Sequence, residues 1–374
     1  MLYDFLICFI TFFKDFWHYN INLSLYLRER WFSWNLHKVD TLFHAASCGE
    51  AKLLLPILNH YKKENVPYML SVHTPSGHKL MQKYNDHVIL KPMDTFPTMA
   101  WFFLWTRPEK IIISVSDTWF YFLFFAKLFN CKIIYVNYVI KPLKPLRNML
   151  HHFVADKIYL KHKQTREVLQ GNKYEYLGDI RYCMNEKEYI PEKTKKNIIT
   201  IASGNENEID IHIKIMKILI EKTDYKVIYV PRHIHWKAKL ERKLKDALLF
   251  EKTRWFAKNA NPSHKINVYW CYGALEQLYA YSKITLMGDT FNNIGGHNII
   301  EPALKGNSVI VGPQHKALKE TIEELKQVNV LQRPEDILKY LDETPTPELY
   351  CQAEKLKIQT HRALSRFLEN LKTF

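Results

Sequence analysis

The chain has 374 residues and a mass of 44.7 kDa, a length typical of two domains. Hydrophobic residues make up 47% of it and charged residues 24%, with only 11 glycines and 16 prolines, which excludes a disordered, collagen-like or low-complexity protein. Lysine and arginine outnumber aspartate and glutamate by 53 to 38, and this net charge of +15 predicts an anionic partner: a nucleic acid, a phosphorylated substrate or an acidic lipid.

The cysteines are scattered along the chain, and no two of them form a C-x-x-C pair. This spacing predicts buried thiols in a reducing compartment and argues against a disulfide framework or a zinc site. We therefore expect a protein that faces the cytoplasm. The six are Cys8, Cys48, Cys131, Cys183, Cys271 and Cys351.

The chain opens with an apolar run at Phe5–Phe13 (FLICFITFF). It is shorter than the roughly 20 residues that a membrane-spanning helix needs. It also lacks the basic start and the small-residue cleavage site of a signal peptide. Aromatic residues suited to headgroup depth, such as Trp17 and Trp31, follow it. We expect residues 1–35 to form an interfacial membrane anchor; the alternative is a helix packed on the body of the protein.

From about Val39 onward, apolar strand-like runs alternate with helical patterns, which predicts parallel sheets covered by helices on both faces. The expected strands are Thr41–Ala46, Tyr68–His73, His87–Leu90, Lys110–Val115 and Lys132–Asn137, then Asn197–Ala202, Lys226–Pro231, Ile266–Trp270, Ile284–Met287 and Ser308–Gly312. Helical patterns cover Glu50–Tyr61, Gly77–Tyr84, Thr118–Phe129 and Pro347–Leu371.

These patterns predict an α/β protein with two Rossmann-like domains, at residues 36–185 and 197–345, and a C-terminal helix at 346–374. The charged stretch at 187–196, which contains Pro191, is interpreted as the linker. In such folds ligands bind beyond the carboxyl ends of the strands, so we expect the site in a cleft between the domains.

The motif Ser47-Cys48-Gly49-Glu50 directly follows the first expected strand. The pattern S-x-x-E is typical of a capping box, in which Ser47 caps a helix and Glu50 reaches back to its start. A carboxylate in the first turn of a helix that lines a cleft can also act as a base on a substrate hydroxyl. Spacing alone favours the cap.

A second motif joins Gly295, Gly296 and His297 to Asn298-Ile299-Ile300-Glu301. It predicts a helix with Asn298 as its N-cap, while paired glycines allow a backbone to approach a phosphate at a helix start. Arg232, at the end of a strand, is either a phosphate ligand or a solvated charge. His233 and His235 have no carboxylate or thiol nearby in the sequence, so we expect no metal site there.

Taken in order, the segments FHAASCGEAKLLLPIL, HTPSGH, SDTWFYFL, YVNYVI, LGDIRY, VPRH, YGALEQLYA and GGHNIIEPALKGNSVIVGP resemble the Kdo transferases, between about Phe43 and Pro313. That family transfers 3-deoxy-D-manno-octulosonic acid (Kdo) from CMP-Kdo to a lipid A precursor at the cytoplasmic face of the bacterial inner membrane. The resemblance implies the GT-B fold, inversion of the anomeric centre, no catalytic metal or other cofactor, and often an N-terminal membrane anchor.

The resemblance also implies roles for individual residues. Glu50 matches the family's general base, Asp117 the last acidic residue of an E-T-E-L-W motif, and Arg181 a lysine credited with stabilising the transition state. The segments that match those holding the CMP-sugar contain Ser47, Gly49, Pro231, Arg232, Tyr272, Gly273, Ala274, Gly296, His297, Asn298, Ile299, Ile300 and Glu301.

The chain departs from the family's pattern at several of these motifs. Val115 stands where the family has the first glutamate of the acidic motif, and Asp117 is one methylene shorter than the second. The further departures are Phe120 for a proline, Tyr138-Val139 for alanine-arginine, Asp179 for an asparagine, Arg181 for a lysine and Asn205 for a histidine. An arginine does not reproduce the geometry of a lysine. We therefore expect a divergent member, with a changed acceptor or sugar donor and a weakened catalyst as the two alternatives.

Two aromatic stretches, Trp101–Trp105 and Trp119–Phe125, are interpreted as core, with an outward landing surface for acyl chains beside Lys141 and Lys144 as the alternative. Three functions remain open: Kdo transfer to a membrane glycolipid, transfer of another nucleotide-activated sugar, and a catalytically quiet lipid-binding protein. We expect an anionic membrane surface as a partner. Nucleic acid is not expected, because the basic residues are dispersed and no binding motif occurs.

Overall fold

The computed structural model describes residues 30–31, 36–140, 145–163, 171–184, 195–233, 235–257, 261–271, 273–341 and 347–374. The chain divides into two compact units, the first of Met1–Met184 with Gln359–Phe374 and the second of Asn185–Ile358. The predicted anchor at 1–35, except Arg30 and Trp31, and the predicted linker at 187–196, except Lys195 and Lys196, lie outside the described residues. Within the described part, no helix is both long and apolar enough to cross a membrane.

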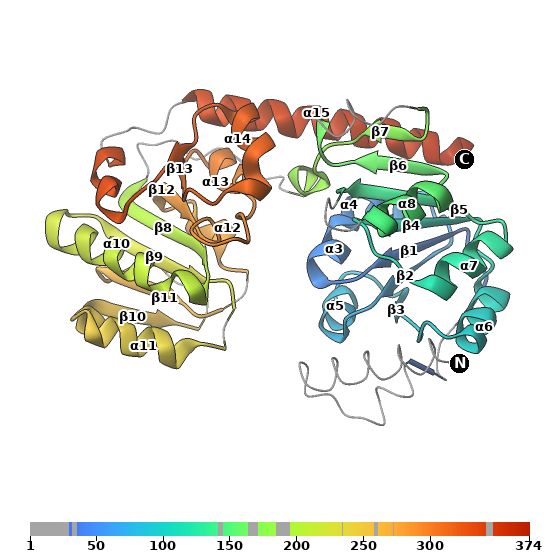
Figure 1. Cartoon of the computed structure of the whole chain (residues 1–374), viewed down its shortest axis with the longest axis horizontal. Coiled ribbons are helices and arrows are strands. Elements are labelled where there is room, and N and C mark those ends of the chain that lie inside the picture. The colour runs from blue at the N-terminus through green and yellow to red at the C-terminus, as the bar shows by residue number, and fades with distance from the viewer. Residues whose placement is uncertain are drawn as a thin grey trace. The chain divides into compact units, whose positions relative to one another are not determined.

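The first unit is built on a seven-stranded parallel sheet with the order β3-β2-β1-β4-β5-β6-β7 (Figure 1). Its strands are β1 (Thr41–Ala45), β2 (Tyr68–Val72), β3 (Val88–Leu90), β4 (Lys110–Ser114), β5 (Lys132–Tyr138), β6 (Lys157–Leu160) and β7 (Tyr174–Tyr176). The chain moves outward from β1 to β3 and then returns to the other side of β1 with β4. The strand order therefore reverses between β1 and β4, and in such sheets ligands bind at the carboxyl ends beside that reversal.

Helices cover both faces of this sheet because successive strand side chains alternate between two apolar cores. Phe43 and Ile112 belong to the core under α3 (Cys48–Leu53), α4 (Leu55–Lys63) and α5 (Pro75–Met81). Leu42 and Ile111 belong to the core under α6 (Phe96–Thr106), α7 (Phe120–Leu128) and α8 (Pro145–Val154). The single helix predicted over Glu50–Tyr61 is two helices, because Pro56 has no N–H to continue the hydrogen bonds of α3.

The second unit repeats the plan with a parallel sheet of order β10-β11-β9-β8-β12-β13-β14. Its strands are β8 (Lys196–Gly204), β9 (Lys226–Pro231), β10 (Thr253–Phe256), β11 (Ile266–Tyr269), β12 (Ser282–Met287), β13 (Ser308–Val311) and β14 (Asn329–Val330). The helices α10 (Ile209–Lys222) and α11 (Lys237–Asp246) pack on one face and α12 (Leu275–Leu278) on the other, while α13 (Ile300–Leu304) and α14 (Lys319–Leu325) flank β13 in sequence. Here the order reverses between β8 and β12.

The last helix, α15 (Pro347–Thr373), starts in the second unit and ends in the first. Leu364, Phe367 and Leu371 of its second half are buried in the core of the first unit. The prediction of a closing helix over Pro347–Leu371 is confirmed.

All ten predicted strands are present, and the α/β class with two Rossmann-like sheets is confirmed. The strands that the sequence did not predict are β6, β7, β10 and β14, which lie at or next to the sheet edges. The described cysteines are free, as expected, but they are not all buried, because Cys351 is exposed.

Candidate functional site

Three predicted residues of the first unit, Ser47, Gly49 and Glu50, lie at the carboxyl end of β1, and Asp117 follows β4. These are the two strands between which the strand order reverses. Ser114, the last residue of β4, donates its hydroxyl to the Glu50 carbonyl at 3.0 Å and thereby joins the two segments. The structure thus brings the SxGE motif and Asp117 to the place where a doubly wound sheet binds its ligands.

Glu50 has the geometry of a cap. The Ser47 hydroxyl accepts the Glu50 N–H at 3.4 Å, and the Glu50 carboxylate accepts the Ala46 N–H at 2.8 Å through Oε2. The capping interpretation is therefore confirmed, with Ala46 as the backbone donor in place of the expected Ser47. The same contact orients the carboxylate at the strand end, so capping and base catalysis are compatible roles. A side chain added at Gly49 would meet open space, so this turn leaves room for a ligand.

Asp117 is held by three donors. Trp119 Nε1 and His44 Nε2 lie 2.7 and 2.8 Å from Oδ2, and the Thr118 N–H lies 3.1 Å from Oδ1. Burial alone would raise the pKa of this carboxyl, but the hydrogen bond and charge of His44, together with the hydrogen bond from Trp119, hold it well below its ordinary value. Asp117 is therefore an ionised acceptor in the folded protein, suited to orienting a partner rather than to donating a proton.

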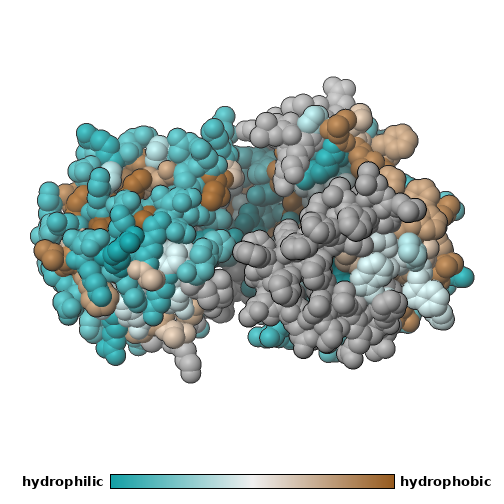
Figure 2. Space-filling model, turned by 60° about the horizontal axis from the view of Figure 1, so that its bottom comes forward, coloured by the Kyte–Doolittle hydropathy of each residue, from teal (hydrophilic) through white to brown (hydrophobic). Residues whose placement is uncertain are grey.

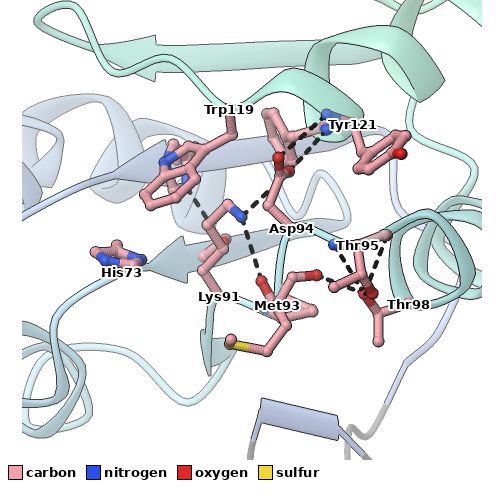
Figure 3. A network of polar contacts seen from close by, with 12 residues as sticks. His73, Lys91, Met93, Asp94, Thr95, Thr98, Trp119 and Tyr121 are labelled. Atoms are coloured by element: carbon pink, nitrogen blue, oxygen red, sulfur yellow. Dashed lines mark hydrogen bonds and ion pairs between the residues drawn. The ribbon is translucent and has the colours of Figure 1, made fainter. Parts of the chain in front are cut away.

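A buried polar network lies behind Trp119 (Figure 3). The Lys91 ammonium lies 4.3 Å from the centre of the Trp119 ring, and the His73 ring lies 4.5 Å from it. Lys91 Nζ also donates to the Pro92 carbonyl at 3.2 Å and lies 3.6 Å from Asp94 Oδ1. Arg30 binds the carbonyls of Lys91 and His73 at 2.7 and 2.8 Å.

Asp94 connects this network to the start of α7. Its carboxylate accepts the N–H groups of Tyr121 and Phe122 at 3.1 and 2.9 Å, the contacts drawn above Asp94 in Figure 3. A carboxylate at a helix start is favourable because the first N–H groups have no partner within the helix. The segment that carries Asp117 and Trp119 is therefore fixed both by the ring contacts of Trp119 and by the anchored start of α7.

Two of the departures from the family pattern have structural consequences near Asp117. Val115 has a φ of +65°, a left-handed conformation that is costly for a β-branched residue. Tyr138 is buried, and its hydroxyl is hydrogen-bonded to His151 Nδ1 at 3.1 Å, while the other ring nitrogen of His151 contacts the Thr118 hydroxyl. Burial lowers the pKa of His151 to about 4, so this imidazole is neutral and serves to hold Thr118 in place.

Arg181 also lies beyond the carboxyl ends of the strands of this sheet, after its outermost strand β7. Its guanidinium binds Asp179 through Nε, 3.0 Å from both carboxylate oxygens, and through Nη2, 2.5 Å from Oδ2. Asn137, next to the last residue of β5, accepts the Ile180 N–H at 3.1 Å and fixes this turn. In the described part of the first unit, Glu50, Asp117 and Arg181 therefore all lie at the carboxyl ends of the strands, after β1, β4 and β7.

In the second unit, the loop after β12 and the GGH motif form a connected group. His297 Nε2 lies 2.5 Å from Asp289 Oδ2, and Asn292 donates to Asp289 Oδ1 at 2.9 Å. Glu208, buried beside β8, accepts the N–H groups of Asp289 and Phe291 at 2.7 and 2.6 Å. Burial raises the pKa of Glu208 despite these donors. Asp289 therefore orients His297, and Glu208 holds the loop that carries Asp289; the motif contains neither carboxylate.

The predicted helix start at Asn298 is wrong by one residue. α13 begins at Ile300 with Ile299 as its N-cap, and Asn298 instead accepts the Ile300 N–H at 3.0 Å. The helix has only 5 residues. Its charge effect is limited to its first N–H groups, since a macrodipole needs a longer row of aligned peptides. Gly296 has a φ of +95°, and a side chain there would clash with Leu318 at 2.5 Å, so the paired glycines are required by the fold itself.

The other residues predicted to bind the CMP-sugar are distributed around the same sheet. Pro231 ends β9, and the Arg232 N–H donates to the Gly204 carbonyl at 2.8 Å. Gly273 has a φ of +82° and Ala274 is the N-cap of α12, while Tyr272 lies outside the described residues. His233 and His235 lie in the same region, and a carboxylate approaches His235, although none was expected near these two histidines.

That carboxylate is Glu206, whose Oε2 lies 3.7 Å from His235 Nε2. Among the described residues, however, no three histidine, cysteine or acidic side chains are grouped so that they could hold a metal ion. The absence of a metal at the proposed site stays a prediction.

Sequence reasoning missed the residues that orient the site: His44, Lys91, Asp94, Glu208 and Asp289. Several of their partners lie far along the chain; His44 and Asp117, for example, are 73 positions apart. The available signal was weak and consisted of polar residues such as His44 inside an apolar strand.

Comparisons with known proteins give similarities in sequence and in fold. Residues 26–159 match the family model described as 3-deoxy-D-manno-octulosonic-acid transferase. The 3-deoxy-D-manno-octulosonic acid transferase of Aquifex aeolicus is 30% identical over 75% of this chain and 78% of its own length. The transferase of the same name from Chlamydophila psittaci is 26% identical over 76% of this chain and 71% of its own.

Among solved structures, HepE from Anabaena in complex with UDP has a TM-score of 0.65 at 12% identity, over 90% of this chain and 100% of that one. A UDP-N-acetylglucosamine 2-epimerase has a TM-score of 0.62 at 13% identity, over 91% of this chain and 98% of that one. At such low identity these structures support the fold alone.

Proposed function

The chain belongs to the 3-deoxy-D-manno-octulosonic acid transferase family and is a glycosyltransferase, and we propose that it moves Kdo from CMP-Kdo to a lipid A precursor. The observation that carries the proposal is the position of Glu50. Its carboxylate lies at the carboxyl end of β1, beside the strand-order reversal, and is oriented by the Ala46 N–H at 2.8 Å. The room beside Gly49 would admit an acceptor hydroxyl.

In this proposal Glu50 is the general base. It takes the proton of an acceptor hydroxyl while the hydroxyl oxygen attacks the anomeric carbon of Kdo from the face opposite CMP. The new carbon–oxygen bond forms as the bond to the CMP phosphate breaks, so the anomeric centre inverts and CMP leaves with both bonding electrons. Asp117, fixed by His44 and Trp119, would orient a hydroxyl by accepting its proton in a hydrogen bond.

We assign CMP binding to the second unit. Arg232 follows the carboxyl end of β9, and the Gly295–His297 turn follows β12, so cationic and backbone N–H groups lie at the edge where a Rossmann-like sheet binds phosphates. Asp289 orients the His297 ring through Nε2. Stabilisation of the leaving phosphate by such groups requires no metal ion.

The outer faces of α6, α7 and α8 support a membrane-bound acceptor. Phe102 and Phe103 are buried, so the core interpretation of the aromatic stretches is confirmed in part. Yet α6 and α7 also expose large apolar side chains, which we call the apolar surface: Phe96, Trp101, Trp105, Phe120, Phe124 and Leu128. α8 adds Leu146, Met149 and Phe153.

Figure 2 shows brown residues gathered over part of the first unit, whereas the second unit is mostly teal. Exposed tryptophan and phenylalanine suit the interface of a bilayer, and the net charge of +15 suits an anionic leaflet. We therefore place the protein at the cytoplasmic face of the bacterial inner membrane. Lys141 and Lys144, which were expected beside this surface, lie outside the described residues.

One specific observation favours a second candidate, the transfer of another nucleotide-activated sugar to a membrane glycolipid. Val115 and Asp117 replace two glutamates of the family pattern, and the Asp179–Arg181 pair replaces asparagine and lysine. These residues follow the carboxyl ends of β4 and β7, where Asp117 and Arg181 would contact a substrate.

The experiment is a transfer assay with CMP-Kdo generated in situ and a tetraacylated lipid A precursor, with product masses read by mass spectrometry. A gain of one or more Kdo units supports the proposal and counts the additions. No gain, together with a higher melting temperature in CMP, redirects the search to another sugar. Absence of both favours the lipid-binding alternative.

A further inference from the structure

Asp179 is a buried carboxylate between two cations. It is 2% exposed, and besides the three contacts from Arg181 it lies 3.3 Å from the Lys161 ammonium through Oδ2. Burial alone would raise its pKa, but the charges of Arg181 and Lys161 lower the pKa to about 2. The carboxylate is therefore ionised at any pH at which the protein works, and the three groups together carry one net positive charge.

The turn that holds Asp179 has little freedom. Gly178 has a φ of +84°, and a side chain there would meet the Thr360 hydroxyl of α15 at 2.8 Å. The Ile180 N–H is bound by Asn137, and the Arg181 N–H is bound by Asp179 Oδ1 at 3.1 Å. Asp179 thus has a fixed place at the carboxyl ends of β6 and β7, on the edge that carries Glu50 and Asp117.

The cations differ from the carboxylate in exposure. The Arg181 side chain is 36% exposed, so its guanidinium can meet a ligand while Asp179 cannot. Two points of contact, through Nε and Nη2, fix the plane of the guanidinium, which an exposed arginine would otherwise leave free to rotate. A lysine at 181 would be a point charge drawn onto the same carboxylate.

We propose that Asp179 is a positioning residue that holds Arg181 and Lys161 as one preorganised cationic group for the negative charge of the transition state. This inference rests on the proposed function, because that charge develops as CMP leaves. It also explains the paired departure from the family pattern: the arginine is matched to a carboxylate, and a lysine would be matched to an uncharged asparagine. Arg181 and Asp179 therefore form one unit, and changing either alone should be worse than changing both.

The test is a double-mutant cycle in the transfer assay. Asp179→Asn keeps an oxygen for the Arg181 N–H and removes the charge that orients the guanidinium. We expect kcat to fall about 10-fold for Asp179→Asn and about 100-fold for Arg181→Lys, with the donor KM changed less than about 3-fold, as for a group that acts in the transition state. The double variant should recover more than about 10-fold over Arg181→Lys and so exceed both single variants, which a purely structural role does not predict.

Asp156→Asn is the matched control. Asp156 also binds two lysines, Lys127 at 3.0 Å and Lys132 at 3.8 Å, and one backbone N–H. It directly precedes β6, however, and so lies at the amino ends of the strands, away from Glu50 and Asp117. Its replacement should leave kcat unchanged. An equal loss in the Asp156 and Asp179 variants, or additive effects around the cycle, overturns the inference.

The Lys161→Gln variant is a second test of the inference, because it leaves Asp179 paired with Arg181 and the fold intact. A fall in kcat of about 5-fold at unchanged donor KM supports the inference, and an unchanged kcat overturns it. If the unmodified chain transfers no Kdo, the proposed function fails and this inference fails with it. If the unmodified chain is active, the cycle and this variant judge the inference alone.

Discussion

Replacement of Lys91 by methionine tests the buried network behind the site. Lys91 is 1% exposed, and its ammonium contacts the Trp119 ring, the Pro92 carbonyl and Asp94. Methionine has nearly the same length and packs well against an aromatic ring, so Trp119 keeps its support. Asp94 keeps the N–H groups of Tyr121 and Phe122. The variant should therefore fold and retain its activity.

The pH dependence of stability gives the magnitude. Burial lowers the pKa of Lys91 from 10.5 to about 8, although Asp94 opposes the shift. Between these values the unfolded chain binds more protons than the folded chain, so stability rises with pH in this window. With about 1.36 kcal/mol for each pKa unit, Lys91 contributes a rise of about 2 kcal/mol in the free energy of unfolding between about pH 7.5 and about pH 9.5.

The assay is urea unfolding of the wild-type chain and Lys91→Met at several pH values in this range. The difference between the two isolates Lys91, because every other titrating group is common to both. We expect the wild type to gain about 2 kcal/mol relative to the variant as the pH rises. A difference that stays constant with pH would refute the reasoning, because it would mean that the ammonium is not desolvated beneath Trp119.

Three further predictions concern the site and the apolar surface. Gly49→Ala should raise the free energy of unfolding by about 0.5–1 kcal/mol, because alanine favours the helix. The same substitution should lower turnover, because it fills the space beside Glu50. Turnover equal to that of the wild type would show that no ligand approaches Gly49. Val115→Asn should raise the free energy of unfolding by about 1 kcal/mol, since asparagine tolerates a positive φ better than valine; a lower melting temperature would contradict this. Serine in place of both Trp105 and Phe124, which are exposed, should weaken binding to anionic vesicles at unchanged melting temperature, and undiminished sedimentation with the vesicles would remove the apolar surface from membrane binding.

The central strands were predictable because continuous burial leaves an unmistakable pattern. Ile111–Ile113 and Ile133–Val136 are apolar at every position, as expected for parallel strands covered on both faces. The strands missed are short and more polar; β7, for instance, is Tyr-Glu-Tyr at Tyr174–Tyr176. A strand of this kind pairs because its neighbour offers an edge, and that information is not local.

The candidate site, too, has residues that the sequence predicted and residues that it did not. Ser47 and Glu50 were found because a cap is a local motif, with its contacts within four residues. The partner of Asp117 was not, because His44 reaches it only when β1 and β4 lie side by side. The helix start at Asn298 was misplaced by one residue: Asn298 does accept the Ile300 N–H, but Ile299, which has no side-chain cap, stands between Asn298 and the helix.

Glu50 as the base of Kdo transfer is the central claim, and Glu50→Gln tests it most directly. Glutamine can still accept the Ala46 N–H, so the start of α3 is preserved while the proton acceptor is lost. The matched control is Glu64→Gln, which removes an exposed carboxylate at the end of α4 that is paired with Lys372. The measurement is the rate of Kdo addition to the lipid A precursor by mass spectrometry, with CMP binding followed in parallel. We expect Glu50→Gln to be slower by at least about 100-fold, with CMP binding unchanged and Glu64→Gln fully active. Kdo transfer by Glu50→Gln at the wild-type rate would contradict the account.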